Sequence, residues 1–443
     1  MISEAYLTRT LGEHPHREAI LRIISCAMQA VEPANAVRQY VQRRGDVLRL
    51  GEHEYRLGED TRIRLLAVGK AAQAMSLPLV ELLADLQPQG LLIPKHLPGQ
   101  PIPGLECQVG GHPIPDENSL RAGEKAIQQV QGLREDDLLI CLVSGGGSAL
   151  MSAPHPGVSL TDLQALTSTL LACGARIDEI NTLRRHLDRL KGGGLARLAA
   201  PARVVSLILS DVVGNALQTT ASGPTAPDPT TREDALHILE KYALRAEAPL
   251  SILKVLETTS ETPKPGDSLF ERVQNLLVGS NQIAAQAALQ QATAEGFHTR
   301  FLGDAWQGEA RQVGKELGQV LKNSTSERPM CLIAGGETTV TLRGQGRGGR
   351  NQELALAAVG ELAGIPDVLL IALATDGEDG PTDAAGAVVS GDTFSRGMAL
   401  GLMPEDYLAN NDAYNYFERL GDLLKPGPSG TNVNDLFFLI RFK

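Results

Sequence analysis

Glycine and arginine are concentrated in one short stretch of the chain, Ala334–Arg350, which reads AGGETTVTLRGQGRGGR. The stretch holds six glycines and three arginines between two strand-like segments. Glycine lets a backbone approach a ligand closely, and a guanidinium binds phosphate or carboxylate oxygens in pairs. The stretch therefore predicts an anion-binding loop, with backbone contacts from Gly346, Gly348 and Gly349 and a phosphate contact from Arg350.

Carboxylates are concentrated in a second stretch, Thr375–Ala385, which reads TDGEDGPTDAA and follows an apolar run. Magnesium usually takes one or two protein carboxylates and keeps several waters, and the spacing here is not that of an EF-hand. Asp376 and Asp379 are the candidate metal ligands, and other acids in the stretch are expected to form turns. Cationic and acidic stretches together indicate a phosphate-plus-metal site, and hence an enzyme.

Four buried strands are predicted to end in residues that can do chemistry. The apolar runs RLLAVG, DLLICLV, VVSLILS and VLLIALA are followed, in this order, by Lys70, Ser144–Ser148, Asp211, and Thr375 with Asp376. In an open α/β sheet, ligands bind at the carboxyl ends of the strands. The pattern predicts that these residues line binding sites.

The second of these segments is a run of three glycines between two serines: Ser144, Gly145, Gly146, Gly147 and Ser148. Its consecutive backbone N–H groups could form a concave nest for an anion. The run lacks the Gly-Lys-Ser/Thr ending of a P-loop. A tight strand-to-helix turn is the alternative, but three glycines are more than a turn requires, which favours contact with phosphate or carboxylate.

Single residues leave more than one interpretation open. Lys70 could meet an anion at the start of a helix, or could be a solvated lysine beside a turn. Asp211 could bind Mg²⁺, accept a hydroxyl proton, or cap the next helix. His112 and His186 are expected to be structural.

The glycines of 344–349 also form a literal G-x-G-x-x-G, the pattern of a dinucleotide-binding turn. Arg347 lies within that turn, and the nearest acid at a suitable spacing, Asp367, begins the next strand instead of ending it. An anion loop in which Arg350 holds a phosphate is the preferred interpretation.

Composition excludes several classes of protein. The chain has 443 residues, 42% of them hydrophobic, and a formal net charge of −11. A chain of this length is expected to form two domains. No basic stretch is long enough to follow a nucleic acid, and no apolar run approaches the roughly 18 residues of a membrane helix. The polar N-terminus lacks a signal core, so a cytoplasmic protein with reduced cysteines is expected.

The order of predicted elements indicates an α/β fold throughout, because buried strands alternate with helices as in a parallel sheet covered on both faces. A first helix is predicted over 16–44, and strands over 330–334 and 339–342. The polar segment 322–329 is the predicted boundary, which divides the chain into domains at 1–325 and 326–443.

Taken together, the motifs resemble those of the glycerate 2-kinase family, whose members carry a C-terminal MOFRL domain. The resemblance covers most of the chain in order and lies in the segments VGKA, GGHPIPDENS, SGGGSALMSAP, INTLRRHLDRLKGGGLA, LSDVVGN, SGPTAPDPTT, GGETTVTLRGQGRGGRNQELALA, TDGEDGPTDAAGA and GTNVNDL. Long blocks such as SGPTAPDPTT are specific. The first sixty residues and 232–278 match weakly.

The resemblance implies a reaction and a fold. The reaction is transfer of the γ-phosphoryl group of ATP, with Mg²⁺, to the 2-hydroxyl of D-glycerate, in the cleft between a larger Rossmann-like domain and a smaller MOFRL domain. The family's proposed catalytic residues fall on Lys70, Asp211 and Arg350. Asn434 joins Asp376 and Asp379 as a candidate for metal or substrate contact. The implied partners are small molecules, and the protein is expected to be a monomer or homodimer.

Some members of that family carry the label hydroxypyruvate reductase. An NAD(P)H-dependent hydroxypyruvate reductase is therefore the alternative activity, and it would use the loop at 344–349 for the pyrophosphate of the cofactor.

Overall fold

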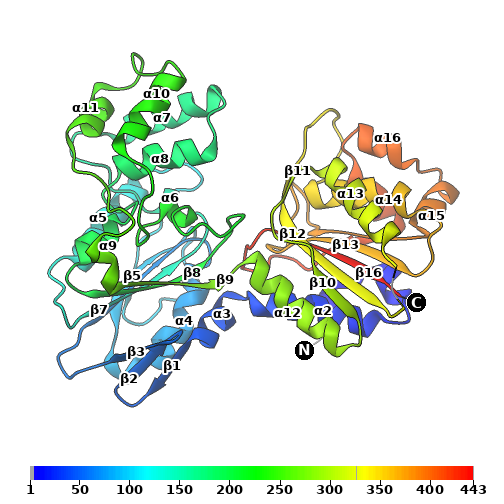
Figure 1. The fold of residues 1–443 in the computed structure, drawn as a ribbon, viewed down its shortest axis with the longest axis horizontal. Helices are drawn as coiled ribbons and strands as arrows, with labels where there is room; N and C mark the ends of the chain where they lie inside the picture. The colour runs from blue at the N-terminus through cyan, green and yellow to red at the C-terminus, as the bar shows by residue number, and fades with distance from the viewer. Residues whose placement is uncertain (1–3, 326, 443) are drawn as a thin grey trace. The chain divides into compact units, whose positions relative to one another are not determined.

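The computed structural model describes residues 4–325 and 327–442. Two compact units make up the chain. The central unit is Pro33–Val278, and the terminal unit joins Met1–Glu32 to Gly279–Lys443. Each unit contains its own sheet and its own apolar core (Figure 1).

The sheet of the central unit has six strands in the order β6-β5-β4-β7-β8-β9. Along the order β6-β5-β4-β7-β8, each strand pairs in parallel with the next, as the continuous apolar runs predict. The strands are β4 (Ile63–Val68), β5 (Gln89–Ile93), β6 (Leu105–Cys107), β7 (Leu138–Val143), β8 (Arg203–Leu209) and β9 (Val273–Gly279).

Helices cover both faces of this sheet. Alternate strand residues, among them Leu66, Leu139 and Cys141, pack with α5 (Glu117–Val130) and α9 (Gly194–Ala199). On the same strands, the intervening residues are also buried, and α4 (Ala72–Leu82) contacts β4, β5 and β7. Side chains of a strand alternate between faces, so burial of both sets requires two covering layers.

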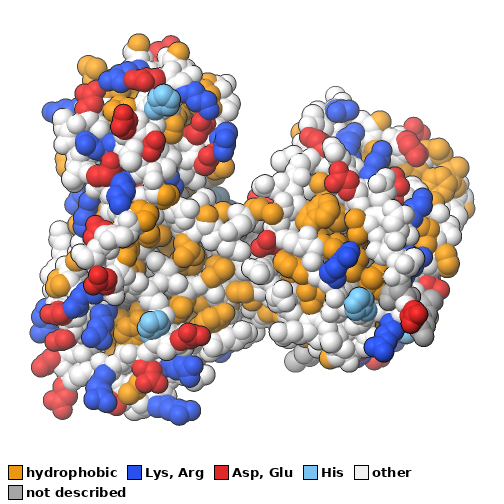
Figure 2. Space-filling view, viewed as in Figure 1, with side chains coloured by type: hydrophobic (Ala, Val, Ile, Leu, Met, Phe, Trp, Pro, Cys, Tyr) orange, Lys and Arg blue, Asp and Glu red, His pale blue; other side chains and the backbone are white. Residues whose placement is uncertain are grey.

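Four further helices of the central unit form a separate apolar cluster. They are α7 (Leu160–Ala172), α8 (Ile177–Leu187), α10 (Arg232–Lys241) and α11 (Leu250–Thr258), grouped together in Figure 1. Figure 2 shows basic and acidic side chains interspersed over the viewed face of this group. Interspersed charges do not form the basic track that a nucleic acid requires.

The predicted single helix over 16–44 is wrong. The structure has α2 (Arg17–Ala30), α3 (Pro33–Tyr40) and a strand β1 (Val41–Arg44). Pro33 begins α3, in keeping with proline's preference for the first turn, where its missing N–H costs nothing. β1 forms an antiparallel sheet with β2 (Val47–Leu50) and β3 (His53–Arg56), which the sequence pattern did not indicate.

The sheet of the terminal unit is mixed, with seven strands. Its main order is β10-β12-β16-β13-β14-β15, and β11 also pairs with β12. The strands are β10 (His298–Phe301), β11 (Trp306–Glu309), β12 (Met330–Thr339), β13 (Val368–Ala374), β14 (Gly386–Ser390), β15 (Leu423–Leu424) and β16 (Asp435–Arg441). β12 runs unbroken to Thr339, so the strand predicted over 330–334 is longer than expected, and the separate strand predicted over 339–342 is wrong because residues 340–342 lie outside any strand.

Helices also cover both faces of this second sheet. One face packs with α13 (Ala310–Asn323), α14 (Arg350–Leu362) and α17 (Ala413–Leu420). α12 (Asn281–Ala294) contacts β10, β12 and β16 and packs against α2. Shorter helices complete the chain: α1 (Arg9–Glu13), α6 (Gly147–Leu150), α15 (Thr393–Ala399) and α16 (Pro404–Ala409).

The units divide the chain at other points than the segment 322–329. Residues 279–325 belong to the terminal unit because β10 pairs in parallel with β12 and α13 packs on α14. The N-terminal segment joins the same unit, where Arg22 pairs with Glu295 at 2.6 Å and Thr431 donates a hydrogen bond to the Val31 carbonyl at 2.7 Å.

The α/β class, the parallel sheet and the smaller C-terminal α/β part are confirmed. Within 4–325 and 327–442, no helix is both long and apolar enough to cross a membrane.

Candidate active site

Three of the predicted strand ends lie side by side in the central unit. β4, β7 and β8 are adjacent and parallel, and their registers align Val68 with Val143 and Val143 with Ile208. Lys70, the Ser144–Ser148 loop and Asp211 follow these strands and therefore come out at one edge of the sheet. The structure thus brings together the first three of the four predicted segments.

The glycines of the Ser144–Ser148 loop allow close contact with Asp211 and Lys70. A Cβ on Gly145 would lie 2.0 Å from Asp211 Oδ2, which is far inside van der Waals contact. Gly146 has φ +85°, and a Cβ there would lie 3.0 Å from the ring of His112 and 3.4 Å from Cγ of Lys70. Only glycine fits at either position, so the loop, the lysine and the aspartate form one assembly.

Hydrogen bonds fix this loop to the end of β4. Ser144 Oγ accepts from the N–H of Ala71 at 3.0 Å, and the N–H of Lys70 donates to the Gly145 carbonyl at 2.9 Å. Among the described residues, the N–H groups of Gly145 and Gly146 have no hydrogen-bond acceptor. The loop therefore still has backbone donors available for an anion.

The two ionisable groups at this edge have different environments. Lys70 is exposed, and its ammonium makes no hydrogen bond or ion pair with the part of the chain that the structure describes. Burial raises the pKa of Asp211, while its own backbone N–H and the positive charge of Lys70 oppose that rise. A carboxyl with a raised pKa is a better proton acceptor, as general-base catalysis requires.

Arg350 lies in the terminal unit, at the start of α14, and two carboxylates fix its side chain. Its guanidinium donates to both oxygens of buried Asp435, at 2.7 and 3.1 Å, and to Glu337 at 3.1 Å. Burial opposes the charge, but these two carboxylates outweigh it and raise the pKa of Arg350. The guanidinium has five N–H groups, so two remain for a ligand.

The other predicted residues of the terminal unit gather at the same edge of its sheet. Antiparallel pairing places Ala374, the last residue of β13, opposite Asp435, the first residue of β16. Thr375 donates its hydroxyl to the Asn434 carbonyl at 2.7 Å, which joins the acidic stretch to β16. Asp376 follows directly and accepts from the N–H of Glu378 at 3.2 Å.

Asp379 is buried, and its carboxylate caps α14. Its oxygens accept from the N–H of Asn351 at 3.1 Å and of Gln352 at 2.9 Å. A Cβ on Gly349 would lie 2.3 Å from this carboxyl group, which explains that glycine. Both carboxylate oxygens thus already accept hydrogen bonds from the first turn of α14. The metal role of Asp379 stays a prediction. Across the described residues, no group of three or more His, Cys, Asp or Glu side chains could hold a metal.

The G-x-G-x-x-G loop is bound to the protein itself. Asn411 accepts from the N–H groups of Arg343 and Gly344, and the Asn410 carbonyl accepts from Gly346 at 2.9 Å. Asp412 accepts from Arg347 at 2.9 Å. Three glycines of this loop, Gly346, Gly348 and Gly349, are predicted to contact a ligand. Among the three, only Gly348 and Gly349 have N–H groups without an acceptor in the described chain.

Sequence reasoning missed Glu337 and Asp435, which bind Arg350, and it expected His112, which lies beside Gly146, to be structural. Each lies inside a segment that carried the family resemblance, and Asp435 directly follows Asn434. The spacing gave no reason to pair Asp435 with Arg350, since 84 residues that include three strands and several helices separate them. His186, by contrast, is buried and bonded to Thr182 and Glu261, a structural environment.

Two family models match the chain. Residues 19–257 match a domain of unknown function, DUF4147, and residues 330–435 match the MOFRL family. D-glycerate 2-kinase of Thermotoga maritima is 41% identical, over 95% of this chain and 97% of its own length. Glycerate 2-kinase of Pyrococcus horikoshii is 37% identical, over 96% and 97%.

A solved structure agrees with these matches. The crystal structure of glycerate kinase from Thermotoga maritima superimposes with a TM-score of 0.86 at 39% identity, and the match covers 96% of this chain and 98% of that one. The fold and site thus define an α/β protein that joins a DUF4147 domain to a MOFRL domain. The chain belongs to the glycerate 2-kinase family.

The buried carboxyl of Asp379 predicts a pH dependence of stability. Burial, and then the charge of Asp435, raise its pKa to about 7 from the usual 3.8. Between pH 3.8 and about 7 the folded protein binds more protons than the unfolded chain. The protonated Asp379 side chain therefore contributes its full stabilisation of the folded protein below pH 3.8, and this contribution is lost as pH rises through 7. The unfolding free energy of the wild type minus that of Asp379→Asn should fall between pH 4 and 8, by at most about 1.4 kcal/mol per pH unit.

Trp306, the single tryptophan, lies in the terminal unit, so its fluorescence during urea unfolding reports on this unit. The matched control is Asp406→Asn, at an exposed position of the same unit. A difference that stays flat or rises with pH would show that Asp379 is not protonated in the folded protein.

Proposed function

We propose that this protein transfers the γ-phosphoryl group of ATP to the 2-hydroxyl of D-glycerate, giving 2-phosphoglycerate and ADP. One observation carries the proposal: the chain aligns over almost its whole length with D-glycerate 2-kinase at 41% identity. The site residues support it, since a free lysine, a half-buried carboxylate and a fixed arginine suit phosphoryl transfer. That reaction depends on positioning and charge neutralisation more than on covalent chemistry.

In this proposal Asp211 receives the proton of the 2-hydroxyl as the oxygen attacks phosphorus, or it binds the magnesium of MgATP. Lys70 and Arg350 neutralise the transferred phosphoryl group, or one of them holds the glycerate carboxylate. The free N–H groups of Gly145 and Gly146 donate to phosphate oxygens. Asp376 and Asn434 are the remaining candidates for contact with the metal or substrate.

Only some of the predicted carboxylates are suited to bind a magnesium ion. Magnesium ordinarily enters kinase sites with the nucleotide and takes one or two protein carboxylates, with phosphate and water completing its shell. Asp211 and Asp376 each have a carboxylate oxygen to offer, whereas Asp379 already caps α14 with both oxygens. Asp379 is therefore the weakest of the proposed ligands.

An NAD(P)H-dependent hydroxypyruvate reductase is the alternative to the kinase. It would require the backbone of 344–349 to approach a pyrophosphate. Most N–H groups of this loop already donate to Asn410, Asn411 and Asp412. This pairing favours the kinase, and a fluorescence titration with NADH separates the two, since a reductase should bind NADH in the micromolar range.

A coupled assay tests the reaction and its regiochemistry. Purified protein is mixed with MgATP, D-glycerate, enolase, pyruvate kinase and lactate dehydrogenase, without phosphoglycerate mutase. We expect immediate NADH loss, because enolase consumes 2-phosphoglycerate directly. A signal that appears only when mutase is added would mean phosphorylation at the 3-hydroxyl. No ADP formation under either condition would overturn the kinase proposal.

Replacing Asp211 with asparagine tests its proposed role. Asn cannot accept a proton and binds Mg²⁺ weakly, so we expect kcat to fall by about 10²–10⁴-fold. Asp136→Asn, at an exposed position of the same unit, is the matched control and should keep the wild-type rate. A kcat of Asp211→Asn within about threefold of the wild type would remove Asp211 from the mechanism.

Gly145→Ala tests whether the contact between loop and carboxylate positions Asp211. The added Cβ would lie 2.0 Å from Asp211 Oδ2, so the carboxylate must move by an ångström or more. A misplacement of this size costs on the order of 100-fold in rate. Gly99→Ala, where a Cβ meets nothing within 4 Å, is the control. Wild-type kcat in Gly145→Ala would show that the position of Asp211 is not set by this contact.

A further inference from the structure

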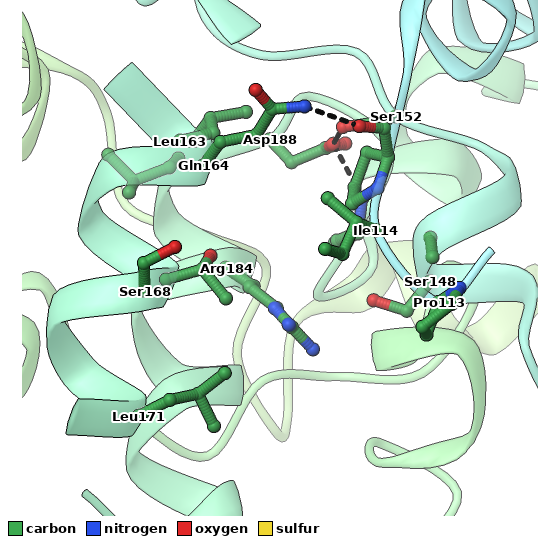
Figure 3. A pocket seen from close by; sticks show the side chains of 15 residues that line it. Pro113, Ile114, Ser148, Ser152, Leu163, Gln164, Ser168, Leu171, Arg184 and Asp188 are labelled. Atoms are coloured by element: carbon green, nitrogen blue, oxygen red, sulfur yellow. Dashed lines mark hydrogen bonds and ion pairs between the residues drawn. The ribbon is translucent and has the colours of Figure 1, made fainter. Parts of the chain in front are cut away.

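A pocket of the central unit lies beside the Ser144–Ser148 loop and contains none of the other residues predicted from the sequence (Figure 3). It encloses about 670 Å³ when the open mouth is included. Its walls come from the segment that precedes α5, from α6 and the residues after it, from α7 and α8, and from the segment after α8. Ser148 belongs both to this pocket and to the loop.

Apolar side chains form two facing walls of this pocket. Ile114 and Leu171 line it although they are 62% and 63% exposed, and Leu163 and Leu187 lie deeper. Figure 3 shows Ile114 on one side and Leu163, Ser168 and Leu171 on the opposite side. Large exposed apolar groups that face each other across a cavity indicate a ligand with a flat apolar part.

Two of the three charged groups in the pocket neutralise each other. Lys191 is buried and pairs with Asp188 at 2.6 Å, and it also donates to the Met151 carbonyl. Asp188 in turn accepts from the hydroxyl of Ser152 and from the N–H of Ala153, both at 2.9 Å. The two charges cancel and leave no net charge for a ligand.

The third charged group is Arg184, and no described residue pairs with it. Its side chain extends into the pocket (Figure 3) and makes no hydrogen bond or ion pair with the described part of the chain. Burial lowers the pKa of Arg184, which reports an unfavourable environment for an uncompensated charge. Its neighbour Arg185, by comparison, pairs with buried Asp228 at 2.8 Å. A half-buried guanidinium without a counter-ion calls for an anion in the pocket.

We propose that this pocket binds the nucleotide, with the base between the apolar walls and a phosphate oxygen on Arg184. The nucleotide would then extend past Ser148 to the free N–H groups of Gly145 and Gly146, beside Lys70 and Asp211. Glycerate is a poorer occupant, because a three-carbon hydroxy acid has a polar group on every carbon and would leave the apolar walls uncovered. The proposal rests on the kinase function and assigns the nucleotide base to the central unit.

Two variants test it independently. Ser168→Phe fills the pocket from α7, and Arg184→Gln removes the charge while leaving a shorter polar side chain. Ala165→Phe is the matched control, because residue 165 is exposed on the same helix and does not line the pocket. Circular dichroism of each purified variant checks folding.

The readouts are the Kd of ADP by calorimetry, without glycerate, and the separate KM values for MgATP and D-glycerate. Both variants should raise the Kd of ADP and the KM of MgATP by about tenfold or more, since a charge-assisted hydrogen bond or a filled pocket is lost. The KM of D-glycerate should stay within about threefold, and Ala165→Phe should match the wild type.

A raised KM for D-glycerate with unchanged nucleotide binding would overturn the proposal and place the acid in this pocket. Unchanged values for both ligands, or no ADP binding by the wild type at millimolar concentration, would also overturn it. The calorimetric measurement needs no turnover. If the coupled assay fails but ADP binding weakens in both variants, the nucleotide pocket stands and only the kinase function falls.

Discussion

The contact of the Asp211 carboxylate with the bare Cα of Gly145 is the constraint on which the central unit's site depends. It forms only because β7 and β8 are adjacent, parallel and in a register that ends both strands together. The same register places β4 on the other side of β7 and delivers Lys70 to the loop. A shift of one strand by one residue would turn each of its side chains to the opposite face of the sheet and separate all three groups.

The terminal unit relies on a different interaction, the bidentate pair of Arg350 with buried Asp435. An unpaired carboxylate at that depth would be costly, so the arginine has a stabilising role beside any catalytic one. Glu337 on β12, Asp435 on β16 and Arg350 on α14 orient the guanidinium from three elements. Removing Arg350 is thus expected to reduce stability as well as activity.

Sequence reasoning predicted most strands and the residues that follow them, because buried parallel strands are continuous apolar runs that need no knowledge of their neighbours. It missed the sheet of β1, β2 and β3, whose short polar-rich strands carry little apolar signal. It predicted Asp379 as a metal ligand, which stays a prediction, because an acidic cluster looks the same whether it binds a cation or caps a helix. The structure shows the cap, since Asn351 and Gln352 donate to that carboxylate.

The sequence by itself determined the α/β class and the family, and it predicted Lys70, Asp211 and Arg350 as site residues, since all of these follow from local patterns and ordered motifs. Tertiary structure alone decided which residues meet. It paired Arg350 with Asp435, bound the glycine loop to Asn410 and Asn411, and left Arg184 unpaired in a pocket while the adjacent Arg185 found Asp228. Neighbouring arginines on one helix point in different directions, and only the packing around them decides which one keeps a free charge.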